Sequence, residues 1–203
     1  MKIKLIEIAL FLALFISVIN CLSFDKECDG IREKVMRLHV IANSDTKADQ
    51  NLKLKVRDNI LSESEVIFSD AESLVVAERE IAKTLPEIEK CAEKALKNEG
   101  YSYDVTVKFE PSYFPTRTYE NVTLPAGFYK SLKVTIGEGK GKNWWCVLFP
   151  PMCLPAATKE DEVLSAVLTE EELSLVSSNP KYEIRFWIVE KLQEFKRSYK
   201  SKT

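Results

Sequence analysis

An apolar run near the N-terminus is the feature that most constrains how this chain can fold. Lys2 and Lys4 precede the run IALFLALFISVI at 8–19, and polar residues follow it. About 12 apolar residues suit the core of an export signal, whereas a membrane-spanning helix needs about 20. A wider window, 5–24, tolerates Glu7 and Asn20 and could serve as an uncleaved anchor. Residues 1–24 are therefore interpreted as a signal peptide or a membrane anchor, and the two leading lysines argue against a buried core helix.

Export would place the cysteines in an oxidising compartment, where disulfides form. Beyond Cys21 there are four cysteines, which allow three pairings: Cys28, Cys91, Cys146 and Cys153. We predict that Cys146 pairs with Cys153, because Pro150 and Pro151 favour a chain reversal between them. Such a short loop would contribute roughly 2.5 kcal/mol. A zinc site is disfavoured, because the chain has no C-x-x-C motif and a single histidine.

Alternating apolar residues predict four strands, at 35–42, 101–109, 128–136 and 144–149. The last two strands flank the glycine-rich segment 137–142 and are expected to form a hairpin. Two amphipathic helices are expected between the first two strands, at 47–61 and 70–98. The fold class is therefore α+β, with an antiparallel sheet of about four strands packed against two or three helices.

The two helices carry recognisable end signals. Thr46-x-x-Asp49 resembles a capping box, and Leu52, Val56 and Ile60 share one helical face. A strand is the alternative for LKLKV, which also alternates. The second helix contains Pro86 and ends before Gly100, as expected of a helix C-terminus. Its heptad spacing also permits a coiled coil, but we prefer packing on the sheet because the pattern is short.

Four segments are interpreted as connections or appendages. Residues 21–30 are expected to be a polar connector, and 110–127 a long proline-containing loop. Residues 156–180 are acidic and predict a connector with short helices. A final amphipathic helix, in the segment YEIRFWIVEKLQEFKRSYK, is expected to dock on the domain, with binding to a membrane surface as the alternative. The chain is thus divided into 1–24, a domain at 30–155, and an appendage at 156–203.

Enzyme and nucleic-acid sites find little support. The net charge of −2 and the lack of a basic cluster interleaved with aromatics argue against nucleic acid. The segment 137–142 has the wrong spacing for a phosphate loop, with Asn143 where Ser or Thr should stand. His39 has no G-x-S-x-G nucleophile as a partner and is expected to be packed or solvated, and Asp45 suits a turn.

The tryptophan-bearing strand at 143–149 is the strongest candidate for a recognition surface. Successive side chains alternate, so Trp144, Cys146 and Leu148 should face one way and Trp145, Val147 and Phe149 the other. Both faces are apolar. Either both sides of the sheet are covered, or one tryptophan lies on an exposed patch that anchors a partner.

Three segments resemble the stage II sporulation protein R family of endospore-forming Firmicutes. They are RLHVIANSDTKADQNLKLKVRDNIL (37–61), FPTRTY (114–119) and LPAGFYKSLKVTIGEGKGKNWWCVLFPPMC (124–153), together with the leader. The resemblance covers roughly residues 35–155, and these long motifs are specific. The acidic connector and the C-terminal helix are less diagnostic.

This resemblance implies a signalling protein without an enzymatic activity, cofactor, metal or small-molecule substrate. Family members are exported from the forespore into the space between the two sporulation membranes. There they activate a membrane-embedded aspartic protease of the mother cell, which processes a sporulation sigma-factor precursor. An uncleaved N-terminal segment would also attach the protein to the membrane.

The contact with that protease is expected on the FPTRTY segment and the tryptophan strand. The candidate residues are Arg117, Tyr119, Trp144, Trp145, His39 and Asp45. Two alternatives remain: an exported cell-wall hydrolase that uses His39 and Asp45, and a scaffold held at the septal membrane by the leader.

Overall fold

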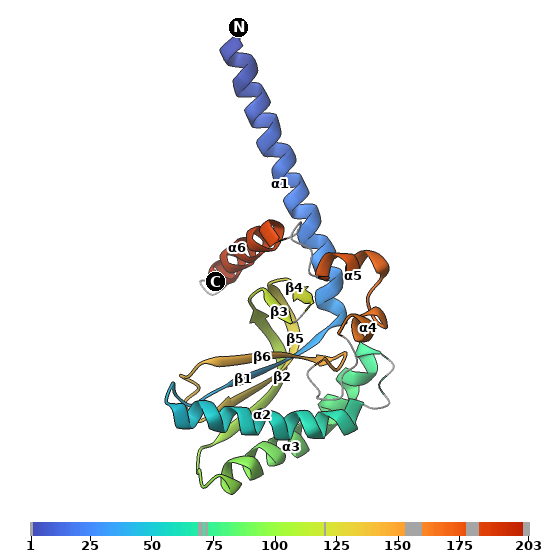
Figure 1. Ribbon diagram of the computed structural model, residues 1–203. Helices are drawn as coiled ribbons and strands as arrows, with labels where there is room; N and C mark the ends of the chain where they lie inside the picture. Colours follow the sequence, from blue (N-terminus) through green and yellow to red (C-terminus); the bar gives the residue numbers. More distant parts are fainter. Residues whose placement is uncertain are drawn as a thin grey trace.

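In a computed structural model, the chain forms a four-stranded sheet with helices on both faces and a separate two-stranded ribbon (Figure 1). The structure describes residues 2–68, 71, 73–119, 121–152, 160–177 and 183–200. Its elements in chain order are α1 (Lys2–Lys34), β1 (Met36–Ile41), α2 (Lys47–Phe68), α3 (Leu74–Asn98), β2 (Val105–Phe114), β3 (Arg117–Tyr119), β4 (Val122–Leu124), β5 (Gly127–Ile136), β6 (Asn143–Phe149), α4 (Glu160–Ser165), α5 (Glu170–Val176) and α6 (Glu183–Lys200). The predicted α+β class is confirmed.

The main sheet has four strands, as predicted, but it is mixed. Its order is β2-β5-β1-β6, with β1 parallel to β5 and antiparallel to β6. The expected hairpin between β5 and β6 is therefore wrong, because β1 lies between them. The segment 137–142 crosses the end of β1, where Lys140 N donates to Asn43 O at 3.1 Å and Gly141 N donates to Ala42 O at 2.9 Å. Strands lie about 4.8 Å apart, so six residues easily span two strand spacings.

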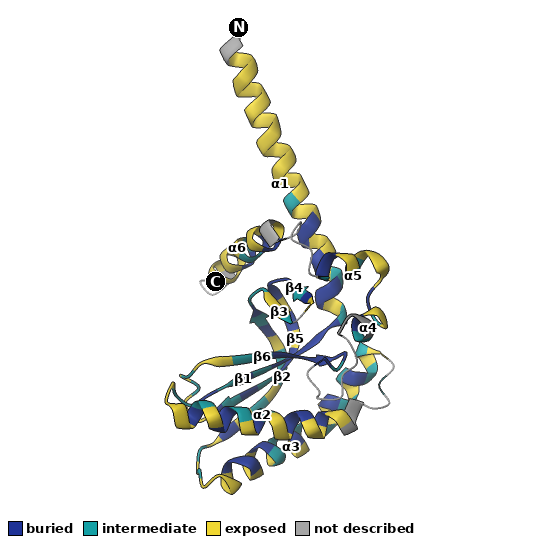
Figure 2. Ribbon diagram, in the orientation of Figure 1, coloured by how far each residue is buried: buried dark blue, intermediate teal, exposed yellow. Residues whose placement is uncertain are grey.

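Helices α2 and α3 cover one face of the sheet and form the first core (Figure 2). The predicted inward residues Leu52, Val56 and Ile60 are buried there, so the helical interpretation of LKLKV is confirmed. Helix α2 begins with the predicted cap, in which Asp49 N donates to the Thr46 hydroxyl at 3.2 Å. It continues to Phe68, beyond the predicted end at Leu61.

The long loop expected at 110–127 is largely strand. Strand β2 continues to Phe114, and β3 and β4 form a separate two-stranded ribbon. Pro111 is tolerated because β2 is an edge strand, where one backbone N–H is dispensable. The ribbon brings the FPTRTY segment over the second face of the main sheet.

A second core lies on that face, between the ribbon and helices α1, α4, α5 and α6. Phe24, Cys28 and Ile31 of α1 are buried in it at helical spacing. The connector expected at 21–30 is therefore helical, because its apolar residues have a surface to pack on. The short helices expected in the acidic segment are present as α4 and α5, and the C-terminal helix is confirmed as α6.

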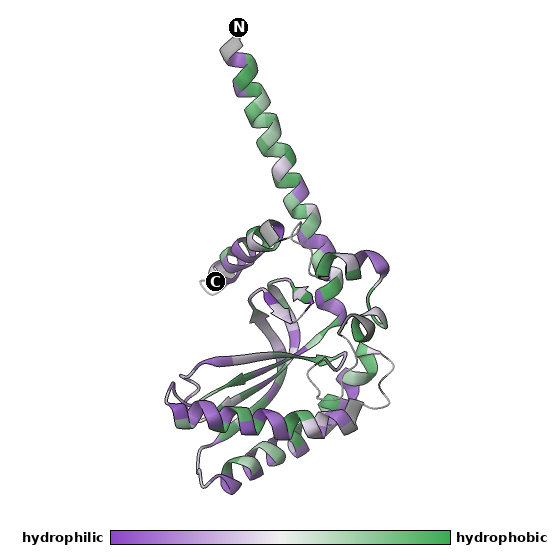
Figure 3. Ribbon diagram, in the orientation of Figure 1, coloured by the Kyte–Doolittle hydropathy of each residue, from purple (hydrophilic) through white to green (hydrophobic). Residues whose placement is uncertain are grey.

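The N-terminal half of α1 projects away from both cores. Large apolar side chains from Leu5 to Leu22 are exposed along it. Figure 3 shows that this half of the helix is predominantly hydrophobic. By length and composition the helix Lys4–Lys34 is able to cross a membrane. This segment fits the predicted signal or anchor.

Candidate recognition site

Arg37 of β1 occupies the centre of the second sheet face. It is fully buried, and its guanidinium carbon lies 4.2 Å from the centre of the Phe114 ring and 4.9 Å from that of Tyr129. Its Nη2 donates to the Tyr119 hydroxyl. Nε and Nη1 have no hydrogen-bond partner among the described residues. Weak hydration of a guanidinium makes arginine suited to such a site between aromatic rings.

His39 lies two residues further along the same face. Its ring stacks on Trp145, with centroids 6.0 Å apart and planes 24° apart, and meets Phe114 edge-on at 5.7 Å. Nε2 donates to Asn143 Oδ1 at 2.9 Å. Burial lowers the pKa of His39, and the positive charge of Lys133 lowers it further, while the hydrogen bond to Asn143 acts in the opposite direction. His39 is therefore harder to protonate in the folded protein than in the unfolded chain.

The β3–β4 ribbon places Arg117 and Tyr119 beside the stacked rings of His39 and Trp145. The Arg117 guanidinium carbon lies 4.4 Å from the centre of the Trp145 ring. The Tyr119 hydroxyl donates to the Trp145 backbone carbonyl at 3.3 Å. His39, Arg117, Tyr119 and Trp145 thus form one cluster, which we name the Arg–Trp platform.

Among the elements that the structure describes, no helix or ribbon covers one end of this sheet face (Figure 1). Cross-strand register places Lys133 and Lys108 in line with His39, and Thr135 and Thr106 in the next row. Lys108 and Thr106 are exposed, and Lys133 is half-buried, with its Nζ 3.0 Å from a carboxylate oxygen of Glu110. The Arg–Trp platform therefore borders an accessible and predominantly basic strip.

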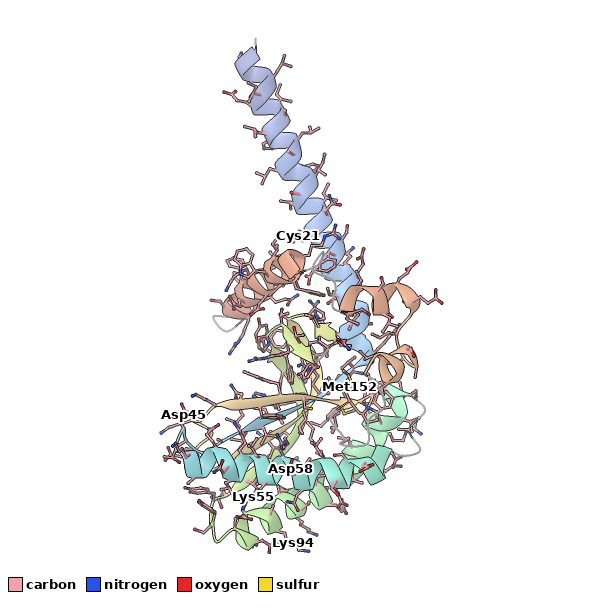
Figure 4. All side chains as sticks on the ribbon, viewed as in Figure 1. Cys21, Asp45, Lys55, Asp58, Lys94 and Met152 are labelled. Carbon is pink, nitrogen blue, oxygen red and sulfur yellow. The ribbon has the colours of Figure 1, made fainter. Side chains whose placement is uncertain are left out.

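The other two candidate residues lie elsewhere. Trp144 is on the opposite face, where the guanidinium carbon of Arg57 in α2 lies 4.3 Å from the centre of its ring. Asp45 follows β1 at the turn before α2, and its Oδ1 accepts a hydrogen bond from Lys142 N at 2.7 Å (Figure 4). Trp144 packs against the first core, and Asp45 holds the crossing segment in place.

The hydrolase alternative finds no geometry for its catalytic pair in the described chain. His39 bonds Asn143 and Asp45 bonds a backbone amide, with no hydrogen bond joining the two side chains. Within the described ranges, no three His, Cys, Asp or Glu side chains group closely enough to hold a metal ion.

The predicted disulfide and the predicted orientation of Phe149 differ in their outcome. Cys146 is buried in the sheet, whereas Cys153 lies outside the described residues, so the disulfide between them stays a prediction. Phe149 packs in the first core rather than beside Val147, because the β1–β6 register shifts between Met36 and Arg37.

Sequence reasoning missed Arg37. The usable signal is its position: it alternates with Leu38 and shares the mixed face of β1 with His39. Its aromatic neighbours come from β2, β3 and β5, so only the sheet order reveals them.

Residues 32–159 match the family profile described as Stage II sporulation protein R. The chain is also 34% identical, over 180 residues, to the stage II sporulation protein R of Bacillus subtilis (strain 168). The match covers 79% of this chain and 80% of that protein. This chain belongs to the stage II sporulation protein R family. No solved structure matches it. The region matched to the stage II sporulation protein R profile includes the main sheet and all four residues of the Arg–Trp platform.

Proposed function

We propose that this chain is an exported, non-catalytic signal of endospore formation. It would leave the forespore, act in the intermembrane space, and activate a membrane-embedded aspartic protease of the mother cell. That protease would then process a sporulation sigma-factor precursor. Family membership and the apolar N-terminal helix support this proposal.

The Arg–Trp platform is the surface we propose for the protease contact. The observation that carries this proposal is the convergence of Arg117 and Trp145 from separate strands onto the accessible end of a sheet face. Arginine and tryptophan are enriched among the residues that dominate protein–protein binding energy. The basic strip beside the platform favours an acidic partner surface.

Arg117→Ala and Trp145→Ala should each abolish precursor processing in sporulating cells. The loss of an anchor of this kind typically costs about 2 kcal/mol or more in binding, or roughly 30-fold in affinity. Immunoblots for the precursor and the mature sigma factor would provide the measurement, with equal levels of the exported protein verified in parallel.

The opposite sheet face supplies a matched control. Arg57 and Trp144 form the same type of cation–π pair at 4.3 Å, but against α2. Arg57→Ala should preserve processing, provided that the chain accumulates normally. Normal processing in both platform variants, or an equal loss in Arg57→Ala, would contradict the assignment of the platform.

A further inference from the structure

The end of the exposed apolar surface on α1 defines where a membrane surface would lie. Exposed apolar side chains continue from Leu5 to Leu22, and Phe24 is the first one buried in the second core. A helix of about 18 residues is about 27 Å long, close to the hydrocarbon thickness of a bilayer, which is about 30 Å. A bilayer that contains this segment therefore ends beside residues 20–23.

Helix α6 lies at that level. A cleft of about 300 Å³ is lined by Ser17, Asn20 and Cys21 of α1 together with Arg185 and Ile188 of α6. Figure 1 shows α6 running across the direction of α1, and Figure 4 shows it beside Cys21. A bilayer crossed by α1 would therefore have α6 along its surface.

Buried polar contacts hold α6 in this position. Asp25 of α1 is 4% exposed and accepts hydrogen bonds from Gln193 at 2.9 Å and from Lys196 at 2.7 Å. Phe24 packs against Phe186, with ring centroids 5.5 Å apart. The position of α6 is thus set by Phe24 and Asp25, which directly follow the exposed apolar segment of α1.

A second apolar stripe on α6 remains exposed. It consists of Trp187, Ile188, Phe195 and Tyr199, which are 61%, 37%, 73% and 69% exposed. At about 100° per residue these positions fall within an arc of roughly 120°. Ile188 lines the cleft with Ser17, so the N-terminal end of the stripe lies beside the apolar half of α1. Phe195 and Tyr199, nearer the C-terminal end, line a second cleft with Phe128 of β5.

We propose that α6 is a membrane-interface helix, which rests its Trp187–Tyr199 stripe in the surface of the bilayer that α1 crosses. Tryptophan and tyrosine prefer the level of the lipid headgroups. The helix carries five Lys or Arg residues against three Glu, which favours anionic phospholipid. Attachment through both helices would hold the sheet, and the platform on it, in one orientation above the membrane. This proposal depends on α1 remaining in the membrane and is independent of which protein the platform contacts.

Fluorescence quenching in lipid vesicles tests the position of Trp187 directly. The full-length chain is reconstituted into phosphatidylcholine–phosphatidylglycerol vesicles with bromine near the headgroup end of the acyl chains. Quenching should be substantial for the wild type and much smaller for Trp187→Phe. Trp144→Phe, which alters a tryptophan of the first core, should be quenched as strongly as the wild type. Equal quenching in wild type and Trp187→Phe would overturn the proposal, as would failure of the chain to sediment with the vesicles.

Amide hydrogen exchange separates lipid contact from contact between proteins. Exchange in α6 should be slower in vesicles than in detergent. Phe195→Glu, at a side chain that is 73% exposed, should remove most of this protection without changing exchange in the sheet. Protection that survives Phe195→Glu would overturn the proposal. Protection that decreases as the protein-to-lipid ratio is lowered would indicate a second copy and would overturn it as well.

Discussion

At the scale of single residues, a buried arginine organises the second face of the sheet. Arg37 of β1 donates a hydrogen bond to the Tyr119 hydroxyl, which in turn donates one to the Trp145 carbonyl. The Tyr119 side chain therefore links the ribbon to both β1 and β6. Aromatic rings stabilise the Arg37 charge, a role that a carboxylate normally has in a buried site. A cation–π interaction of this kind contributes about 2 kcal/mol when it is desolvated. This arrangement sets the position of the exposed Arg117 indirectly.

His39 should make the folded state sensitive to acid. Its pKa is lowered in the folded protein, so the unfolded chain binds a proton more readily. Its contribution to stability is therefore full above its unfolded pKa of about 6.5 and is lost as pH falls through its lower folded pKa. Urea titrations between pH 7.5 and 5 should show stability falling with pH in the wild type and falling less in His39→Gln. Parallel curves for the two proteins would refute this role.

At the scale of elements, the segment that crosses β1 decides the sheet order. It must pass close over the end of β1, and Gly141 is the point of closest approach. An added Cβ at Gly141 would lie 2.3 Å from the carbonyl oxygen of Ser44. The glycines of segment 137–142 therefore permit a close backbone contact as well as a turn.

Gly141→Ala should destabilise the protein by about 2–3 kcal/mol, because backbone atoms must move to relieve the contact. Gly100→Ala is the comparison: Gly100 has φ of 80° but open space around it, so the cost should be only the left-handed backbone penalty of about 1 kcal/mol. Midpoints of urea unfolding provide the measurement. An equal or smaller effect at Gly141 would show that the segment does not pack tightly against β1.

At the scale of the whole molecule, Asp25 joins the projecting helix α1 to the C-terminal helix α6. Its carboxylate bonds Arg32 at 3.0 Å in addition to Gln193 and Lys196. Burial raises the pKa of Asp25, but hydrogen bonds from Lys196 and Gln193 and the charge of Arg32 outweigh this effect and keep the pKa below its usual value. The junction should therefore persist at neutral pH and weaken only in strong acid, as pH falls through that lowered pKa.

Asp25→Asn should loosen α6 from α1, at a cost of about 3 kcal/mol for breaking a buried ion pair. Hydrogen exchange should accelerate in α6 and in 21–34, while β1 and β5 remain protected. Asp29→Asn is the matched control, because Asp29 also bonds Arg32, at 2.6 Å, but its side chain is 59% exposed. That variant should change stability by less than about 1 kcal/mol. Comparable effects of the two substitutions would contradict a central role for Asp25.

The sequence by itself determined the features that depend on local pattern. Alternation located the four main strands, helical spacing identified Leu52, Val56 and Ile60 as core, and continuous apolarity marked the exposed N-terminal half of α1. These features follow from side-chain periodicity along one segment, which needs no knowledge of neighbours.

Only the tertiary structure decided the features that depend on pairing between distant segments. β1 inserts between β5 and β6, the supposed loop becomes a ribbon, and 21–30 becomes helical once a second core covers it. Pairing between distant segments also separates the predicted site residues into two groups. Arg117, Tyr119, Trp145 and His39 lie together, whereas Trp144 and Asp45 lie elsewhere. Hydrogen bonds between strands and burial against α1 come from residues far away in the chain, so no local pattern encodes them.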